Sequence, residues 1–189
     1  MLIANFIHLR VFVLTLFLVS SSISAFSQKR LSTETGAVSF VSNAELELIK
    51  ASSNKAVGLL DPATNKFAFS ILMESFQGFN GSLQRSHFNE NYMESSKFPK
   101  ASFAGKIIEQ VDLTVEGVYN VRAKGDLTIH GEVQPRTIKA KITIKKDDVS
   151  VESEFTVPLT DHNIRIPKIV NQKIATEILV NFKAVLIWK

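Results

Sequence analysis

Long runs of alternating apolar and polar residues constrain the fold of this chain more than any other feature of its sequence. In the run over residues 66–74, Phe67, Phe69, Ile71 and Met73 share one parity and more polar residues occupy the other. A period of two predicts β-strands with one face on the core. The same alternation recurs at Tyr119, Val121, Ala123 and Gly125; at Ile138, Ala140, Ile142 and Ile144; and at Val149, Val151, Ser153 and Phe155.

Turn-forming residues separate these runs and set the strand count. Asp61–Asn65, which contains a proline, predicts a turn before one strand, and Lys146–Asp148 joins two later ones. The alternation of Glu45–Leu48 predicts a further strand, and Ile174–Trp188 predicts an unusually long one. About eight strands with little helix predict an all-β fold, a closed antiparallel β-barrel, because closure removes exposed strand edges. A two-sheet sandwich stays open as the alternative.

One segment breaks the strand rhythm. Between about residues 83 and 93, Leu83, Phe88 and Tyr92 fall on one face of a helix. The sequence therefore predicts a short helical insert, which we expect to cross one end of the barrel.

The N-terminus has the features of an exported protein. Arg10 precedes a short apolar run, and Ala25 and Ser27 supply small residues for cleavage. The apolar run is shorter than the roughly 18 residues of a membrane span, so a membrane anchor is the weaker interpretation. We predict a signal peptide over residues 1–27, one mature domain over 28–189 without a transmembrane span, and a periplasmic or secreted location.

Composition restricts the chemistry further. The chain has no cysteine, which excludes disulfides, thiolate metal sites and a lipid anchor on cysteine. The net charge is only +4, and the lysines clustered between Lys139 and Lys146 are not interleaved with aromatic residues. Nucleic-acid grooves combine both residue types, so we expect no nucleic-acid partner.

The sequence offers little support for catalysis. His87, His130 and His162 lack the close spacing of most metal-binding motifs, so a metal site is the weakest hypothesis. Glu90 and Glu94 are spaced as on a solvated helix face. No nucleophile elbow or phosphate-binding loop occurs in the sequence. We therefore expect a protein that is not an enzyme and has no cofactor, metal ion or catalytic residue.

Two motifs connect the chain to a known family. The segment Ser86–Phe103 reads SHFNENYMESSKFPKASF, and Gly125–Gly131 reads GDLTIHG. Together they resemble the YceI-like family of secreted bacterial proteins, and the resemblance covers most of the chain after the leader. It implies a lipocalin-like barrel that binds an isoprenoid or another amphiphilic lipid.

The choice between a hollow and a filled barrel decides the function. Barrels of about eight strands either fill with side chains or hold one small ligand, and the resemblance favours the ligand. A filled barrel or sandwich that binds a protein partner in the periplasm, through a rim near Lys139–Lys146, is the alternative, and a homodimer stays open. The predicted lipid-binding residues are Phe69, Ile71, Phe76, Phe79, Phe88, Tyr92, Phe103, Ile129, Phe155 and Phe182.

Overall fold

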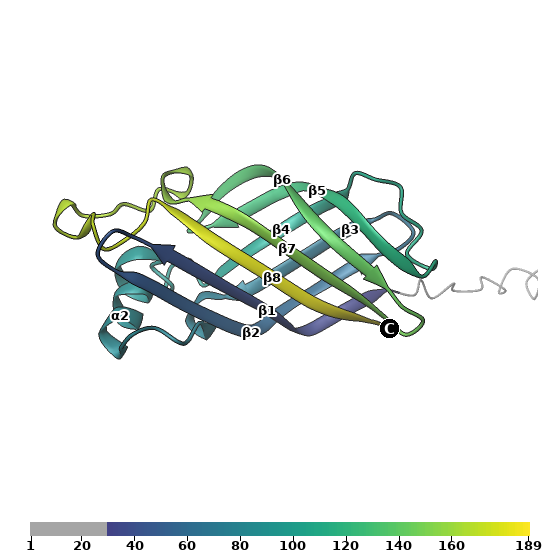
Figure 1. Cartoon of the computed structure of the whole chain (residues 1–189), viewed down its shortest axis with the longest axis horizontal. Coiled ribbons are helices and arrows are strands. Elements are labelled where there is room, and N and C mark those ends of the chain that lie inside the picture. The colour runs from purple at the N-terminus through teal and green to yellow at the C-terminus, as the bar shows by residue number, and fades with distance from the viewer. Residues whose placement is uncertain (1–29) are drawn as a thin grey trace, which may run out of the picture.

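The chain forms a single antiparallel β-barrel in which each strand pairs with its neighbour in sequence and the last pairs with the first (Figure 1). The computed structural model describes residues 30–189. The predicted signal peptide lies outside these residues, and its cleavage after Ser27 stays a prediction. The barrel confirms the predicted fold and replaces the sandwich alternative. Its strands are β1 (Leu31–Asn43), β2 (Leu48–Asp61), β3 (Lys66–Leu72), β4 (Lys100–Ile107), β5 (Gly117–Ile129), β6 (Glu132–Ile144), β7 (Asp148–Pro158) and β8 (Glu177–Trp188).

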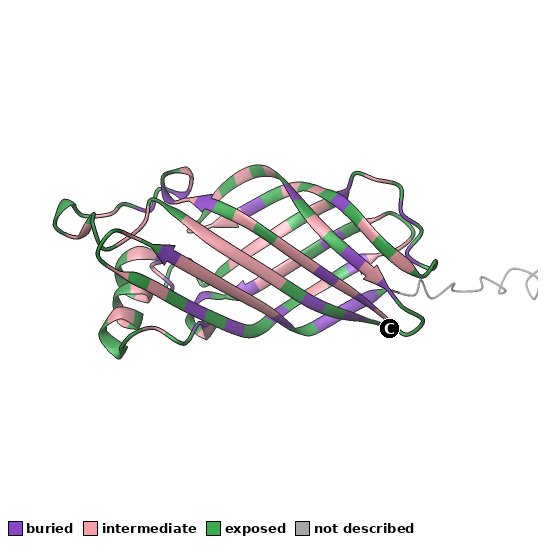
Figure 2. Ribbon diagram, in the orientation of Figure 1, coloured by how far each residue is buried: buried purple, intermediate pink, exposed green. Residues whose placement is uncertain are grey.

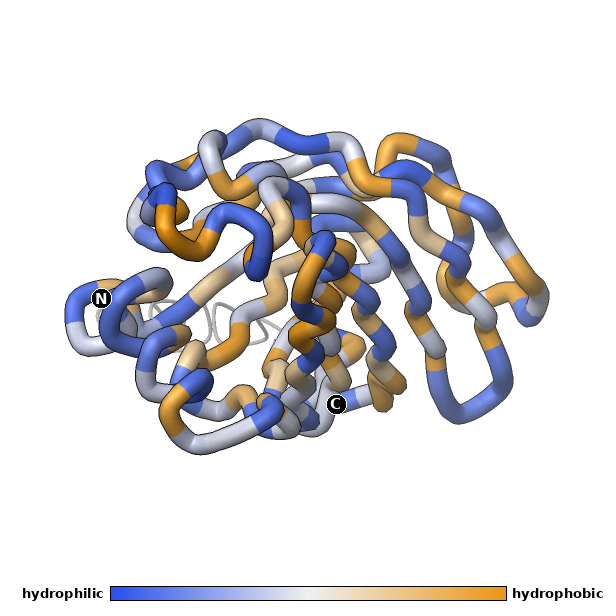
Figure 3. Tube along the Cα trace, turned by 60° about the vertical axis from the view of Figure 1, so that its left-hand side comes forward, coloured by the Kyte–Doolittle hydropathy of each residue, from blue (hydrophilic) through white to orange (hydrophobic). Residues whose placement is uncertain are grey.

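The alternation of the sequence becomes the two faces of the barrel wall. Apolar and polar residues alternate along the strands (Figure 3), and the apolar parity faces the interior. In β3 and β4 the register places Phe69 directly opposite Phe103. Closure by β1 and β8, with Leu31 opposite Trp188, leaves no unpaired edge in the sheet.

Short helices interrupt the connections at one end of the barrel. The helical insert is confirmed: α2 (Ser82–His87) continues directly into a π-helical turn, η2 (Phe88–Tyr92). The strand predicted at Glu45–Leu48 is wrong, because residues 44–47 form the turn between β1 and β2. Four alternating residues are too few to separate a strand from a turn. Single 3-10 turns occur at η1 (Met73–Ser75), η3 (Leu159–His162) and η4 (Lys168–Val170).

The two ends of the barrel are built differently. The closed end holds both termini of the barrel, the turns over residues 62–65 and 145–147, and the loop over residues 108–116 (Figure 1). Val111 and Leu113 of that loop join the buried cluster, and Leu31, Val149 and Leu186 there are fully buried. The opposite end, called here the mouth, holds α2 and the segment over residues 159–176. In the strands nearest the viewer in Figure 2, many residues between the middle of the strand and the mouth are only partly buried.

A tight turn at the mouth connects β5 to β6. His130 and Gly131 both have positive φ, 53° and 77°, as the favoured two-residue hairpin turn requires. A Cβ on Gly131 would also meet the Phe98 ring at 2.5 Å. Glycine is therefore needed here for both its conformation and its size.

Candidate functional site

A single large cavity of about 710 Å³ occupies the barrel interior and reaches the surface at the mouth. Leu60, Phe67, Ile107, Val121 and Ile142 line its deep end. The barrel is thus hollow above a packed floor. Strand alternation alone does not predict whether a barrel interior is hollow or filled.

The structure gathers the residues that sequence analysis nominated for ligand binding. All ten of them line this cavity, although they come from five of the barrel strands and from the insert. Whether they contact a ligand stays a prediction. The ten are Phe69, Ile71, Phe76, Phe79, Phe88, Tyr92, Phe103, Ile129, Phe155 and Phe182.

Aromatic rings form a group just inside the mouth. The ring of Phe40 in β1 lies 5.4 Å from that of Phe76, 6.0 Å from Phe79 and 5.4 Å from Phe88, centroid to centroid. These spacings are typical of attractive aromatic pairs. Phe40 fixes the helical insert to the barrel wall at the point where a ligand would enter.

A second aromatic group lies deeper between the strands. Phe67 contacts Phe103 at a centroid distance of 5.0 Å, and Phe69 contacts Phe182 at 4.9 Å. The Phe69 ring lies over Gly58 of the neighbouring strand, where any Cβ would overlap it. The missing side chain of Gly58 therefore sets the position of one cavity wall.

Polar side chains that line the cavity gather mainly at its mouth. Gln84 Nε2 of α2 donates to Glu47 Oε1 at 2.8 Å, and Gln84 Oε1 accepts from the Asn80 backbone N–H at 3.0 Å. Lys173, from the segment after β7, also lines the opening. Partial burial raises the pKa of the Tyr92 phenol, which keeps it neutral. The cavity therefore has apolar walls and a polar entrance.

A histidine pair closes the side of the mouth. His130 Nδ1 donates to the His162 carbonyl oxygen at 3.0 Å, and His130 Nε2 lies 2.7 Å from Glu94 Oε2. We call His130, Glu94 and His162 the latch, because they join the insert, the β5–β6 turn and the segment after β7.

The histidines do not form a metal centre. His87 lines the cavity mouth instead of joining the latch. Across residues 30–189, no three His, Cys, Asp or Glu side chains converge in a way that could hold a metal ion. The histidine-based metal hypothesis therefore has no geometric basis in this part of the chain.

The lysines of the alternative protein-binding hypothesis are not on the rim. Lys139 and Lys141 project outward from the middle of β6, and Lys145 and Lys146 reach the turn at the closed end. Lys141 forms an exposed 2.7 Å ion pair with Glu152. These lysines lie on the solvated outer face of the barrel, away from the mouth.

Sequence analysis missed several lining residues. Phe40 was detectable, because it shares parity with Val38 and Ser42, which also line the cavity. The segment after β7 gave no such signal, since its turns have no regular period. It nevertheless supplies part of the wall near the mouth through Leu159, Ile164, Val170, Lys173 and Ile174.

Comparisons with known proteins agree with this geometry. The sequence matches the YceI-like domain family over residues 20–186. The chain belongs to the YceI-like family. Among curated proteins, no sequence gives a significant match. In the YceI-like motifs quoted above, Ser86–Phe103 supplies the end of the helix, Glu94 of the latch and the start of β4. Gly125–Gly131 supplies the end of β5 and the latch histidine His130.

Solved structures share the fold at low sequence identity. A polyisoprenoid binding domain from Saccharophagus degradans aligns with a TM-score of 0.69 and 16% identity, covering 86% of this chain and 98% of that one. BcnA from Burkholderia cenocepacia aligns at 0.64 and 18%, covering 80% and 95%. A YceI protein from Campylobacter jejuni aligns at 0.53 and 17%, covering 81% and 84%. At these identities the comparison establishes the shared barrel.

Proposed function

We propose that this YceI-like barrel binds an isoprenoid or a similar amphiphilic lipid without catalysing a reaction on it. The apolar chain would lie in the cavity between Phe69, Phe103 and Phe182, and the head group would remain at the polar mouth. The observation that carries this proposal is the cavity itself, with its apolar walls, packed floor and polar residues at the mouth. Small-molecule sites typically combine such walls with a few well-placed polar groups.

The cavity volume indicates how much of a lipid fits. A cavity of about 710 Å³ lies within the roughly 300–1,000 Å³ typical of small-ligand sites, so it suits one apolar chain of moderate length. A longer chain would extend through the mouth past Phe79 and Phe88.

Two further observations support a binding role. The structural neighbour from Saccharophagus degradans is described as a polyisoprenoid binding domain. The alternative of a filled barrel that binds a protein fits the hollow interior poorly.

Within residues 30–189, no helix is both long and apolar enough to span a bilayer. We further propose that the protein acts after export, in the periplasm or outside the cell, which fractionation with a cytoplasmic marker would test.

Mass spectrometry tests the lipid directly. Protein purified natively from its own host is extracted with organic solvent, and the extract is compared with that of unfolded and refolded protein. The proposal predicts one class of amphiphilic lipid at near-stoichiometric amount in the native sample alone. An extract with no such lipid, from protein that still fails to take up added prenyl alcohols, would contradict it.

A further inference from the structure

Large apolar side chains are exposed around the cavity mouth. Leu46 in the β1–β2 turn is 63% exposed, Leu83 in α2 is 67% exposed, and Ile169 in η4 is 90% exposed. Leu83 also lines the cavity opening, as do the neighbours of Ile169 at Val170 and Lys173. Exposed apolar groups gathered at one place on a protein surface often mark an interaction site.

Hydrogen bonds hold the three elements beside one another. The Leu46 backbone N–H donates to the Gln172 carbonyl oxygen at 2.9 Å, which places the β1–β2 turn against the segment that carries Ile169. The same turn is tied to α2 by the bond from Gln84 to Glu47 at 2.8 Å. Figure 1 shows all three at the same end of the barrel. We call Leu46, Leu83 and Ile169 the apolar rim.

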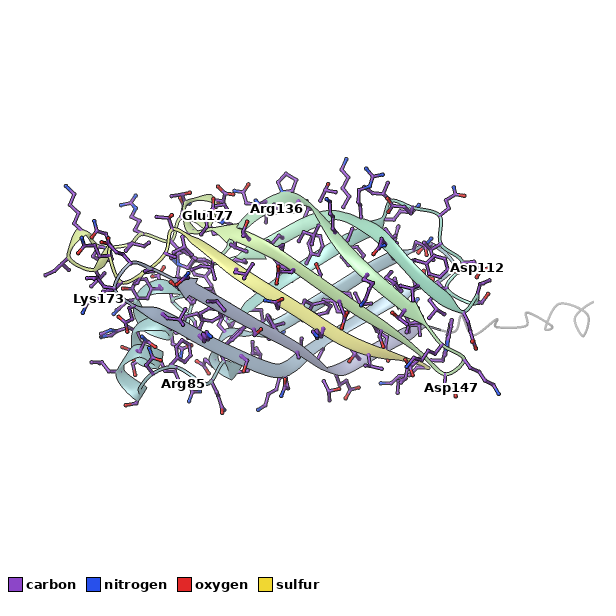
Figure 4. The ribbon with its side chains drawn as sticks, viewed as in Figure 1. Arg85, Asp112, Arg136, Asp147, Lys173 and Glu177 are labelled. Carbon is purple, nitrogen blue, oxygen red and sulfur yellow. The ribbon has the colours of Figure 1, made fainter. Side chains whose placement is uncertain are left out.

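Cations flank the apolar rim. Between residues 163 and 176 the chain carries Arg165, Lys168 and Lys173, all exposed, and no acidic residue. Lys173 and Arg85 project from this end of the molecule, whereas Asp112 and Asp147 lie at the closed end (Figure 4). Acidic residues are also present: Glu45 and Glu47 occupy the neighbouring turn, and Glu177 follows the basic segment at the start of β8 (Figure 4). Glu47 is engaged by Gln84.

We propose that the mouth docks onto the surface of an anionic lipid bilayer. Ile169, Leu46 and Leu83 would enter the interfacial region, while Lys168 and Lys173 would face the phosphate groups. Apolar groups flanked by Lys or Arg are the usual composition of a surface-bound membrane anchor. The cavity would then open toward the bilayer, so that a lipid could enter without crossing water. This last consequence, though not the docking, rests on the proposed lipid-binding function.

The other exposed apolar residues supply a matched control. Val118 at the start of β5 is 64% exposed, nearly as much as Leu83, but it lies near the closed end. Lys145 and Lys146 are exposed there as well. If the mouth docks, only substitutions at the mouth should weaken membrane binding. Non-specific adsorption would be weakened equally by substitutions at either end.

Vesicle flotation tests the docking. The probes are vesicles of phosphatidylcholine with phosphatidylglycerol and vesicles of phosphatidylcholine alone, at low salt. We expect Ile169→Ser to weaken binding to the anionic vesicles about tenfold or more, from the lost apolar burial. The double variant Lys168→Gln with Lys173→Gln should lose about thirtyfold on anionic vesicles. Val118→Ser, and Lys145→Gln with Lys146→Gln, should stay within about twofold of wild type. Urea unfolding confirms that every variant is folded.

The outcomes separate this inference from the proposed function. Phe103→Trp, which narrows the cavity, should still float with anionic vesicles if docking belongs to the rim. Native protein that carries lipid but shows no vesicle binding would overturn the docking and leave lipid binding intact. Vesicle binding by a protein that carries no lipid would support the docking and contradict the proposed lipid binding. Equal loss in the mouth and closed-end variants, or a mouth that binds only a protein partner, would also overturn the docking.

Discussion

The closed end and the mouth are made from the same eight strands, yet one is packed and the other hollow. At the closed end the loop over residues 108–116 turns inward, and Leu113 is only 1% exposed. At the mouth the insert with α2 stays beside the opening, and in the cavity below it Phe103 and Phe182 are only partly buried. Strand alternation thus makes a wall, and the connecting loops decide whether the space behind it is filled.

Among the substitutions that test this comparison, the largest loss of stability is expected at the closed end. Leu113→Ala removes fully packed atoms and should lower the free energy of unfolding by about 3 kcal/mol. Phe103→Ala in the cavity wall should cost less, about 1.5 kcal/mol in lipid-free protein, because part of its ring already faces empty space. Urea denaturation of both variants without lipid gives the two values. Equal losses would show that the cavity wall is packed as tightly as the closed end.

The next effect concerns the latch. His130→Ala removes the partner of Glu94 and of the His162 carbonyl, and it places alanine at a φ of 53°. We expect a loss of about 2 kcal/mol and faster amide exchange in the insert, with the closed end unchanged. His130→Asn, which tolerates this backbone conformation, should lose less. Exchange that rises equally at both ends would contradict a local role for the latch.

A substitution in the cavity should separate ligand binding from stability. Phe103→Trp adds volume where the structure has space, so the lipid-free protein should change by less than about 1 kcal/mol. Bound lipid, measured by mass spectrometry of extracts, should fall well below stoichiometry. Full retention of lipid would remove Phe103 from the ligand path, and unfolding would show that no free space exists beside it.

The smallest effect is the pH dependence of the mouth. His162 is fully buried, its Nε2 has no partner, and burial lowers the pKa of its imidazole below the ordinary 6.5. Its neighbours Asp161 and Arg136 act in opposite directions on that pKa. The unfolded chain therefore takes up a proton first as the pH falls, and stability should decrease below about pH 6.5. Urea midpoints at pH 7.5 and 5.5 should differ more for wild type than for His162→Gln.

Most of the wall was predictable from the sequence, and most of the mouth was not. Parity alone places Phe67, Phe69 and Ile71 inside, because a strand has only two faces. The β1–β2 turn at Glu45–Leu48 was misread, since short alternation also occurs in turns. The latch escaped prediction because Glu94 and His130 are 36 positions apart and come together only when β4 pairs with β5.

The site was partly predictable for the same reason. Aromatic residues of the strands and insert were found by periodicity and by the family resemblance. Phe40 was overlooked in a run that also contains several serines. Ile164 and Ile174 lie in a segment of irregular backbone, where no sequence period reports which side chain turns inward.

The seam between β1 and β8 has a consequence for how the barrel is made. Seven of the eight strand pairings join neighbours in sequence, and the eighth joins Leu31 to Trp188. Such a distant contact must overcome the loop-closure entropy of nearly the whole domain, which slows folding. Until β8 is available, the outer edges of β1 and β7 stay unpaired and prone to aggregation. The last strand synthesised is therefore the one that creates the enclosed interior.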